Sequence, residues 1–360
     1  MTEISTLLGP VSSDDLGIVS LHEHLLFGLH GWQYAPEVDF NHAVAFEKIR
    51  SSLEQFKELG GGTIVDTSGI TLGRDVSFYA KLSQVTGVKI VVATGFDNEP
   101  DSILPSFTWP GTLYRPPNPF EPESKRYSPH VWHREIPGYF YPSYGASKEY
   151  RMFLFYNELT MGMAAPGMIR TKMKAGLVKA GNSWDKITAE EELALRAAAM
   201  AAKRTGLAVI TNGINQARRQ LEIMGEEGLR PSRIIIGHCD DGRAIDLERD
   251  QGFAKKGAYV AYDHIGWEDT SFPHALPDER RVELVKAMID AGFTEQLILS
   301  CSAIGYALGV PPSKHSFSHL LKSFVPKLKK AGVGDGAIDK ILRENPKRIL
   351  ATEKSIGGQK

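Results

Sequence analysis

The sequence predicts an α/β protein folded as a (β/α)8 TIM barrel, and three observations support this. Short, β-rich apolar runs alternate with longer stretches of helical periodicity, which indicates a parallel sheet covered by helices. The runs have the short length expected of parallel strands that are buried on both faces. Eight of them occur in a chain of 360 residues, which suits a barrel better than a doubly wound sheet.

Each element follows from its local pattern. Apolar residues at helical spacing predict helices over 42–59 and 75–85, and an alanine-rich helix over 190–203. Helical patterns also fill the intervals between the last four strands. The eight predicted strands are Gly17–Leu21, Thr63–Asp66, Val88–Ala93, Ala175–Lys179, Ala208–Thr211, Arg233–Gly237, Ala258–Tyr262 and Gln296–Ser300.

The segment 97–148, after the third strand, has neither a helical nor a strand period. It holds ten of the chain's 20 prolines and many aromatic residues, whereas linkers are usually polar. We therefore expect an ordered loop inserted into a single domain spanning 1–360, shaping the substrate pocket or an oligomer contact. A purely structural wrap is the alternative. The candidates for substrate binding are Phe96, directly before this segment, Trp109, Trp132 and Tyr139 within it, and Asn212 after the fifth strand.

The overall composition excludes several classes of protein. With 42 Lys+Arg against 43 Asp+Glu the formal charge is -1, so the basic excess of a nucleic-acid binder is missing. No apolar run is long enough to span a membrane, and the first residues lack a basic, apolar leader. We expect a cytoplasmic protein. Two cysteines, Cys239 and Cys301, make no disulfide framework, and Cys301 is expected to pack in the core.

The sharpest local signal is His22-Glu23-His24 at the end of the first strand. Alternate residues of a strand point to the same face, so the two imidazoles can converge on one ion. Imidazole suits zinc and related divalent metals. A His-x-His pair alone is weak evidence, but the carboxyl end of a barrel strand is where catalytic groups gather.

Four further residues whose side chains could take part in catalysis or metal binding lie at or just after the ends of later strands. These are Lys179, His238, Asp241 and His264. A lone lysine at such a position is more often a salt-bridged structural residue. The coincidence of several such residues at the same end of the barrel favours an active site instead.

Together these motifs resemble the phosphotriesterase-like branch of the amidohydrolase superfamily over nearly the whole chain. The resemblance implies a (β/α)8 barrel, hydrolysis of phosphotriesters or lactones, two bridged divalent metals and, by analogy, a homodimer. The motifs that carry it are Gly9–Val11, Leu21–His24, Thr63–Asp66, Gly73–Val76, Ala93–Gly95, Ala175–Lys179, Ile236–Asp241, Asp263–Ile265 and Glu344–Leu350.

The resemblance also implies a role for each matching residue. His22 and His24 match ligands of the buried metal, and His238 matches a ligand of the more exposed one. Lys179 matches the lysine that carries carbon dioxide as a bridging carbamate. Asp241 and His264 match the pair that relays protons away from the site.

Two positions depart from the pattern. Asn212 stands where the family has its fifth-strand histidine, and Ser302 stands where it has its eighth-strand aspartate. A neutral amide and a neutral hydroxyl are poor zinc ligands beside imidazole, thiolate or carboxylate. We therefore expect at most one tightly bound, zinc-like divalent metal, and a metal-free site is the alternative.

The sequence thus predicts a hydrolase of an ester-like bond, most readily that of a lactone or carboxylic ester. The expected substrate is a small molecule that is bulky or aromatic. His264 and Asp241 would act as the proton relay. A serine-hydrolase arrangement of Ser302, His264 and Asp241 is a further hypothesis. The competing classes are a metal-independent lyase, isomerase or decarboxylase that uses Lys179 as an amine, and a ligand-binding homologue without turnover.

Overall fold

The computed structural model describes residues 2–36, 38–98, 147–165, 169–268 and 275–353. Its central feature is a parallel sheet in the order β12-β11-β10-β9-β8-β5-β4-β3-β13, so all eight predicted strands are confirmed. The strands are β3 (Ile18–Phe27), β4 (Gly61–Asp66), β5 (Lys89–Phe96), β8 (Leu177–Ala180), β9 (Val209–Thr211), β10 (Ile234–Ile236), β11 (Tyr259–Tyr262), β12 (Leu297–Leu299) and β13 (Ile304–Ala307).

The barrel closes through one short stretch of chain. β12 pairs with β11, while β13, only a few residues later, pairs with β3 on the other edge of the sheet. Between them, the amide of Ser302 donates to the carbonyl of His22 at 2.9 Å, and the amide of His24 donates to the carbonyl of Ala303 at 3.0 Å. The eighth strand is therefore split into two halves, and the break lies against the His-x-His motif.

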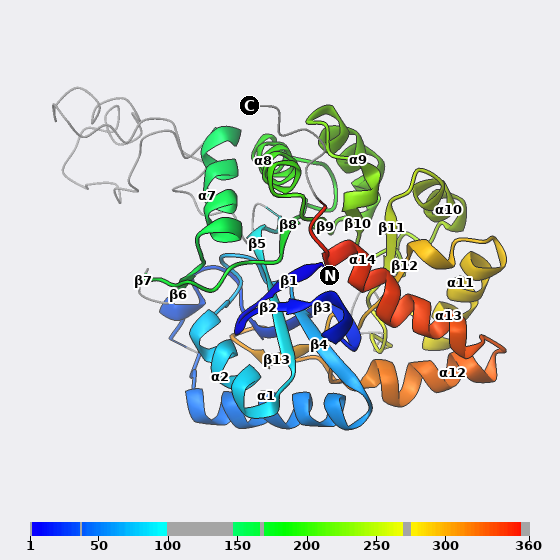
Figure 1. The fold of residues 1–360 in the computed structure, drawn as a ribbon, viewed down its shortest axis with the longest axis horizontal. Coiled ribbons are helices and arrows are strands. Elements are labelled where there is room, and N and C mark those ends of the chain that lie inside the picture. The colour runs from blue at the N-terminus through cyan, green and yellow to red at the C-terminus, as the bar shows by residue number, and fades with distance from the viewer. Residues whose placement is uncertain (1, 37, 99–146, 166–168, 269–274, 354–360) are drawn as a thin grey trace, which may run out of the picture.

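The helices surround the sheet as the periodicity predicts (Figure 1). Thr188 caps α8 with a reciprocal capping box to Glu191, and the carboxylate of Asp75 caps α2 by accepting the backbone amides of Ser77 and Phe78. The α-helices are α1 (His42–Glu58), α2 (Val76–Thr86), α7 (Lys148–Thr160), α8 (Ala189–Thr205), α9 (Ala217–Glu226), α10 (Leu247–Lys255), α11 (Asp278–Asp290), α12 (Val325–Lys330), α13 (Asp335–Asp339) and α14 (Asn345–Leu350). The shorter turns are η1 (Ser13–Asp15), η2 (Trp32–Tyr34), η4 (Ile214–Gln216), η5 (Pro231–Arg233), η6 (Thr294–Gln296) and the π-helical η7 (Leu320–Phe324) and η8 (Lys340–Glu344).

An N-terminal hairpin that the sequence did not predict closes one end of the barrel. It consists of β1 (Glu3–Thr6) and β2 (Gly9–Ser12), and in Figure 1 it lies over the strands near α14. Ile4 packs into the interior cluster together with Ile349 and Leu350 of α14. Because the hairpin approaches the early part of β5, where Leu7 donates to the carbonyl of Ile90, the opposite, carboxyl end of the strands is left for chemistry.

The apolar core of the protein has two layers, one inside the barrel and one between the barrel and its helices. The interior layer contains side chains such as Val65, Val91 and Ile298, and the outer layer lies between strands and helices. A second small hairpin, β6 (Ala164–Ala165) with β7 (Ile169–Arg170), follows α7. Within the described residues, none of the helices combines the length and apolar character needed to cross a membrane.

Candidate active site

His22 and His24 are placed side by side by β3, as the alternation predicts. Both are buried, and their ring centroids are 5.4 Å apart. The end of β4 fixes the orientation of the second ring. Ser68 donates its hydroxyl proton to the carbonyl of Leu26 at 3.1 Å, so it accepts from Nδ1 of His24 at 3.0 Å. The proton of His24 is therefore on Nδ1, and Nε2 keeps its lone pair.

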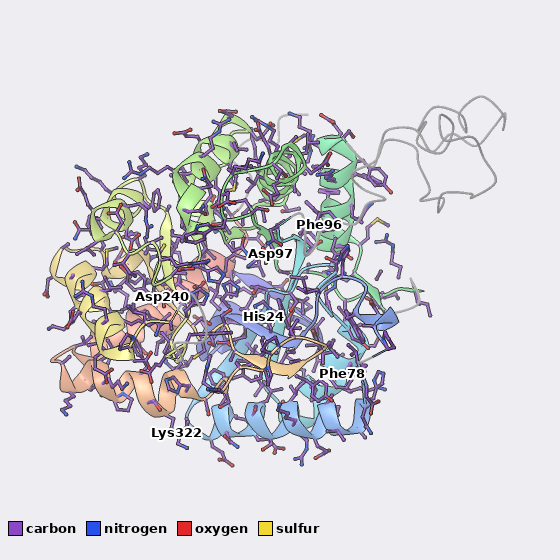
Figure 2. All side chains as sticks on the ribbon, turned by 180° about the vertical axis from the view of Figure 1, so that it is seen from behind. His24, Phe78, Phe96, Asp97, Asp240 and Lys322 are labelled. Atoms are coloured by element: carbon purple, nitrogen blue, oxygen red, sulfur yellow. The ribbon has the colours of Figure 1, made fainter. Side chains whose placement is uncertain are left out.

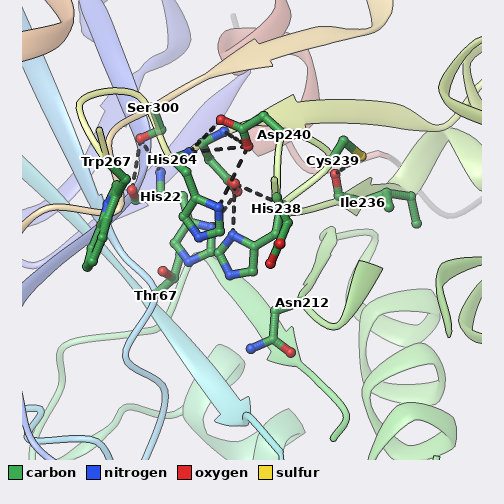
Figure 3. A network of polar contacts seen from close by, with 12 residues as sticks. His22, Thr67, Asn212, Ile236, His238, Cys239, Asp240, His264, Trp267 and Ser300 are labelled. Carbon is green, nitrogen blue, oxygen red and sulfur yellow. Dashed lines mark hydrogen bonds and ion pairs between the residues drawn. The ribbon is translucent and has the colours of Figure 1, made fainter. Parts of the chain in front are cut away.

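One aspartate, Asp263, orients the imidazoles of both His22 and His238. Asp263, directly after β11, accepts from Nδ1 of His22 at 2.7 Å and from Nδ1 of His238 at 2.9 Å. It also accepts the backbone amide of His238 at 2.8 Å, which holds this residue in a left-handed conformation with φ of 59°. A carboxylate behind the histidines fixes the tautomer in which Nε2 is free to bind a metal. Figure 3 shows the rings gathered on one side of this network.

Burial keeps the imidazoles of His22 and His24 neutral. Desolvation, reinforced by the charge of Lys179, lowers the pKa of His22 to about 4. Desolvation likewise lowers the pKa of His24 well below its usual value. Burial alone would raise the pKa of Asp263, but His238 and His22 outweigh it and hold the pKa well below the usual range. At neutral pH His22 and His24 therefore offer neutral nitrogen donors close to an ionised carboxylate.

A buried ion pair supports this arrangement from behind. Asp240 accepts the backbone amides of Asp263 and His264, each at 3.0 Å. Its other partner is Nε of Arg281 at 2.7 Å, and both side chains are fully buried. The ring of His264 stacks on that of His238 with centroids 4.1 Å apart. Asp240 thus fixes the backbone that carries Asp263 and His264. The sequence analysis did not select Asp240, although it selected the adjacent Asp241.

Lys179 reaches the same cluster from β8. Its side chain is 1% exposed, and its Nζ lies 3.3 Å from Nε2 of His22 and 3.6 Å from a carboxylate oxygen of Asp97. β5 approaches β8 closely here because Gly95, with φ of 101°, lacks a side chain, and a Cβ there would overlap the Lys179 carbonyl. Asp97 is the second residue that the sequence reasoning missed.

The two proposed relay residues have separate surroundings. The carboxylate of Asp241 accepts from Nε and Nη2 of Arg243 at 3.0 and 2.8 Å, and this guanidinium stacks on Trp184. The ring of His264 lies 3.9 Å from Asp240. The contact that the relay needs, between His264 and Asp241, therefore remains a proposal.

The two substituted positions differ in their environment. Asn212 donates its amide nitrogen to Asp97, and its oxygen accepts the backbone amide of Asn182 at 3.3 Å. Ser302 has a left-handed backbone with φ of 45°. Among the contacts of the described residues, no hydrogen bond joins the Ser302 hydroxyl to His264. Glu23 holds the chain around Ser302 by accepting the amides of Cys301 and Ala303 at 3.0 and 2.7 Å.

Of the aromatic candidates, Phe96 is the one that the described residues include. Trp109, Trp132 and Tyr139, with almost all of the expected 97–148 loop, fall outside the described residues. Phe96 is fully buried in the outer layer and packs edge-on against Phe155 of α7 at 5.3 Å. This places Phe96 in the wall between β5 and α7 (Figure 2). Cys301 is buried and unpaired, and burial raises the pKa of its thiol well above the usual value, as a packed core cysteine requires.

The donors present fit a divalent metal. Within the described residues, two groups bring three possible ligand atoms within 4.8 Å of one another: His22, His238 and Asp263, and Asp240, Asp263 and His264. The Asp263 oxygens in these groups already accept protons from two imidazoles. The fit therefore depends on the opposite Nε2 edges of His22, His24 and His238, together with Lys179. Nitrogen donors of this kind suit zinc and similar ions.

Comparisons with known proteins identify the family. A family model described as the phosphotriesterase family matches residues 2–113 and 139–350. A phosphotriesterase homology protein of Mycobacterium tuberculosis is 29% identical and covers 97% of this chain and 98% of that protein. An aryldialkylphosphatase of Saccharolobus solfataricus is 27% identical, with 95% and 97% covered. An N-acetyltaurine hydrolase of Xenopus tropicalis is 24% identical, with 97% of each covered.

The solved structures give the same picture at the level of the fold. A triple mutant of an organophosphorus hydrolase from Deinococcus radiodurans matches with a TM-score of 0.78 and 25% identity, over 98% of each chain. A single mutant of the same enzyme matches with a TM-score of 0.79. Both comparisons extend over essentially the whole length of the chain described above.

Proposed function

The chain belongs to the phosphotriesterase family, and from this membership we propose that it is a metal-assisted hydrolase of a lactone or carboxylic ester. The observation that supports the proposal best is the set of three imidazoles, two of them buried and that of His238 partly exposed, whose Nδ1 atoms are all engaged from behind. Histidines that bind a metal through Nε2 usually have a hydrogen-bond partner at Nδ1, which fixes the tautomer and the orientation of the ring. The named relatives with stated activities are hydrolases, which supports the reaction class.

Each residue has a defined part in the proposed reaction. His22, His24 and Lys179, the last as a carbamate, would hold one divalent ion, with His238 beside them. Such an ion supplies Lewis acidity and lowers the pKa of a water molecule. His264 accepts the proton released on attack, and Asp241 receives it in turn. Asp240, through the backbone amide of His264, keeps this ring stacked on His238.

An ester or lactone is proposed over a phosphotriester because of the substituted positions. In the family resemblance the phosphotriester reaction depends on two ions, and Asn212 and Ser302 offer only neutral oxygen in place of strong ligands.

The substrate is proposed to be a bulky or aromatic small molecule. If so, changing Trp109, Trp132 or Tyr139 singly to Ala should raise KM while the Tm stays nearly unchanged. A large fall in Tm with intact kinetics would make the segment a structural wrap.

The proposal is tested with a substrate panel. Purified protein is assayed on aliphatic and aromatic lactones, carboxylic esters, N-acyl amino sulfonates and phosphotriesters, before and after chelation and again with added zinc. We expect turnover of a lactone or ester that chelation abolishes and zinc restores. Turnover that survives complete metal removal, or that is confined to phosphotriesters or amides, would contradict the proposal.

The metal count has its own matched variant. We expect at most one tightly bound equivalent of divalent metal per chain. Asn212→His combined with Ser302→Asp should raise this toward two, because each change restores a strong ligand. Two equivalents in the unaltered protein, or no gain in the double variant, would show that these positions do not limit metal binding.

One observation favours a second candidate function. The Nζ of Lys179 is buried between His22 and Asp97, an environment that also suits an amine that forms a Schiff base with a carbonyl substrate. In that case the protein would be a metal-independent lyase, isomerase or decarboxylase. Borohydride trapping with carbonyl compounds separates the two: a stable adduct on Lys179 supports the amine, and hydrolysis without adduct supports the metal-assisted reaction.

A further inference from the structure

We propose that Asp97 is the carboxylate ligand of the metal in this chain, and that Asn212 is the positioning residue that holds it. This inference rests on the proposed function, because it concerns the same ion. The resemblance implies a histidine ligand at the position of Asn212, after β9. In the proposal, the carboxylate of Asp97, at the end of β5, takes over the role of that missing ligand. Figure 2 shows Asp97 and His24 labelled near the middle of the barrel.

The geometry of Asp97 is that of an anchored side chain with one oxygen directed at the site. The residue is 8% exposed. Its Oδ1 accepts the amide nitrogen of Asn212 and the backbone amide of Asn98, the latter at 2.9 Å. Its Oδ2 lies 3.6 Å from Nζ of Lys179. Because Nε2 of His22 is 3.3 Å from the same nitrogen, an ion held near the end of Lys179 is within reach of both an imidazole and this carboxylate.

Asn212 is itself fixed for this task. Its side-chain oxygen accepts the backbone amide of Asn182 at 3.3 Å, and its backbone carbonyl accepts Nε2 of Gln220. Its amide nitrogen is then left to hold Asp97. The neighbouring Gly181 leaves the space that the pair fills, because a Cβ there would overlap Oδ1 of both Asp97 and Asn212. Asn212 thus bridges two segments of backbone to a carboxylate.

The charges in the site support the same assignment. The carboxylates of Asp263 and Asp240 are used by two imidazoles and by Arg281, respectively. Asn212 and Ser302 are neutral where the resemblance implies a histidine and an aspartate, so the site lacks a negative charge that would offset a divalent ion. Hard and borderline cations bind carboxylate oxygen readily, and Asp97 brings one negative charge to the end of Lys179 where the resemblance places the bridging carbamate.

A competing explanation makes the opposite prediction. If Asp97 only paired with a free Lys179 ammonium, removing its charge would ease carbamate formation and raise the metal content. If Asp97 is a ligand, removing its charge lowers the metal content. The direction of the change therefore decides between the two, without any measurement of turnover.

The experiment measures zinc affinity by competition with a chromophoric chelator, and the visible spectrum of the cobalt(II) form, in the full-length protein with bicarbonate present. For Asp97→Asn we expect zinc affinity to fall at least about tenfold, with altered cobalt bands, as for loss of a ligand or its close support. Asp97→Glu, which keeps the carboxylate, should stay within about threefold of the original. Asp290→Asn, the same change at an exposed position of α11, should alter nothing.

The anchor is tested separately, which covers the case in which Asp97→Asn does not fold. Asn212→Ala keeps the carboxylate but removes its support, and we expect zinc affinity to fall by less than in Asp97→Asn but by more than twofold, in line with the effect of outer partners. Unchanged or increased zinc affinity in Asp97→Asn, or in Asn212→Ala when the first variant is unfolded, overturns the inference and leaves the proposed function intact. Failure of the unaltered protein to bind zinc or cobalt overturns both.

Discussion

Two sides of the site are built in different ways. On the carboxylate-backed side, His22 and His238 share Asp263, and Asp240 with Arg281 holds the chain behind them. On the substituted side, Asn212 and Ser302 stand in the places of a histidine and an aspartate, with Asn212 turned toward Asp97. The first side has the buried, fully paired charges that orient metal ligands. The second has neutral groups that are weak metal ligands themselves.

This difference indicates what the protein still does. A buried ion pair is a weak source of stability, because desolvation offsets most of its attraction. The position of the Asp240–Arg281 pair directly behind Asp263 and His264 therefore suggests that it serves to hold the site. The substituted side suggests that the site holds one ion where the resemblance implies two. The predictions below test this contrast.

The largest effect is expected for Arg281→Met. This change leaves Asp240 buried without its cation, so the free energy of unfolding should fall by about 3–5 kcal/mol. The neighbouring Arg280→Met removes an exposed pair with Glu283 and should cost less than about 1 kcal/mol. Urea denaturation of both variants makes the comparison, and equal small losses would show that the pair behind the site is unimportant.

Asp263→Asn should damage the carboxylate-backed side next. Two imidazoles lose the anion that accepts their Nδ1 protons, and the loss of such a partner lowers metal affinity by about 10–100-fold. Because one residue serves two rings, we expect the upper end of this range. Zinc affinity measured with a chelator provides the test. A variant that binds zinc as tightly as the original would refute the role given to Asp263.

In the metal-free protein, the buried imidazoles of His22 and His24 should each lower stability in mild acid. Glu23, Asp66 and Asp250, whose pKa values burial raises, act in the opposite direction. The folded state keeps His22 neutral, with a pKa lowered to about 4, and keeps that of His24 well below normal, whereas both titrate near 6.5 once unfolded. As the pH falls from 6.5 toward 4, the unfolded chain binds more protons. Each histidine then lowers the free energy of unfolding by up to about 1.4 kcal/mol per pH unit.

Denaturation curves across this range, in the presence of a chelator, measure the slope. His24→Gln should reduce the slope by removing one of the two contributions. The same dependence of stability on pH in His24→Gln and in the unaltered protein would contradict the description of His24 as buried and neutral.

The smallest effect is expected on the substituted side. Ser302→Ala should change kcat/KM by less than about threefold, equivalent to less than about 0.7 kcal/mol in the barrier, and leave the zinc affinity unchanged. The reason is that the hydroxyl makes no hydrogen bond to His264 among the described residues and is a weak ligand. A loss of a hundredfold or more would instead support Ser302 as an acyl-forming nucleophile.

Much of the fold could be predicted because buried strands are recognisable as short apolar runs. The ends of those runs also located His22, Lys179 and His238, since each follows or completes such a run. The N-terminal hairpin was missed because strands of only four residues, Glu3–Thr6 and Gly9–Ser12, do not repeat long enough to show an alternation.

Within the site, sequence reasoning failed where the choice depends on side-chain direction. Asp240 and Asp241 are adjacent, and only the structure shows that one holds the backbone of His264 while the other meets Arg243. Asp97 directly follows the observed strand β5, but the predicted strand ended at Ala93 and Asp97 opened the segment without any period, so it was assigned to the loop. The hydrogen-bond partners that set the imidazole tautomers, such as Ser68, lie far from them in sequence.

The central claim is that one divalent ion binds at the carboxyl end of the barrel, on the Nε2 atoms of His22 and His24. Anomalous diffraction at the zinc absorption edge, from crystals of the unaltered protein grown with zinc, tests this most directly. The account predicts one strong peak per chain, bonded to both imidazoles and adjoining Lys179. Two strong peaks in the site, or none beside these imidazoles, would contradict it.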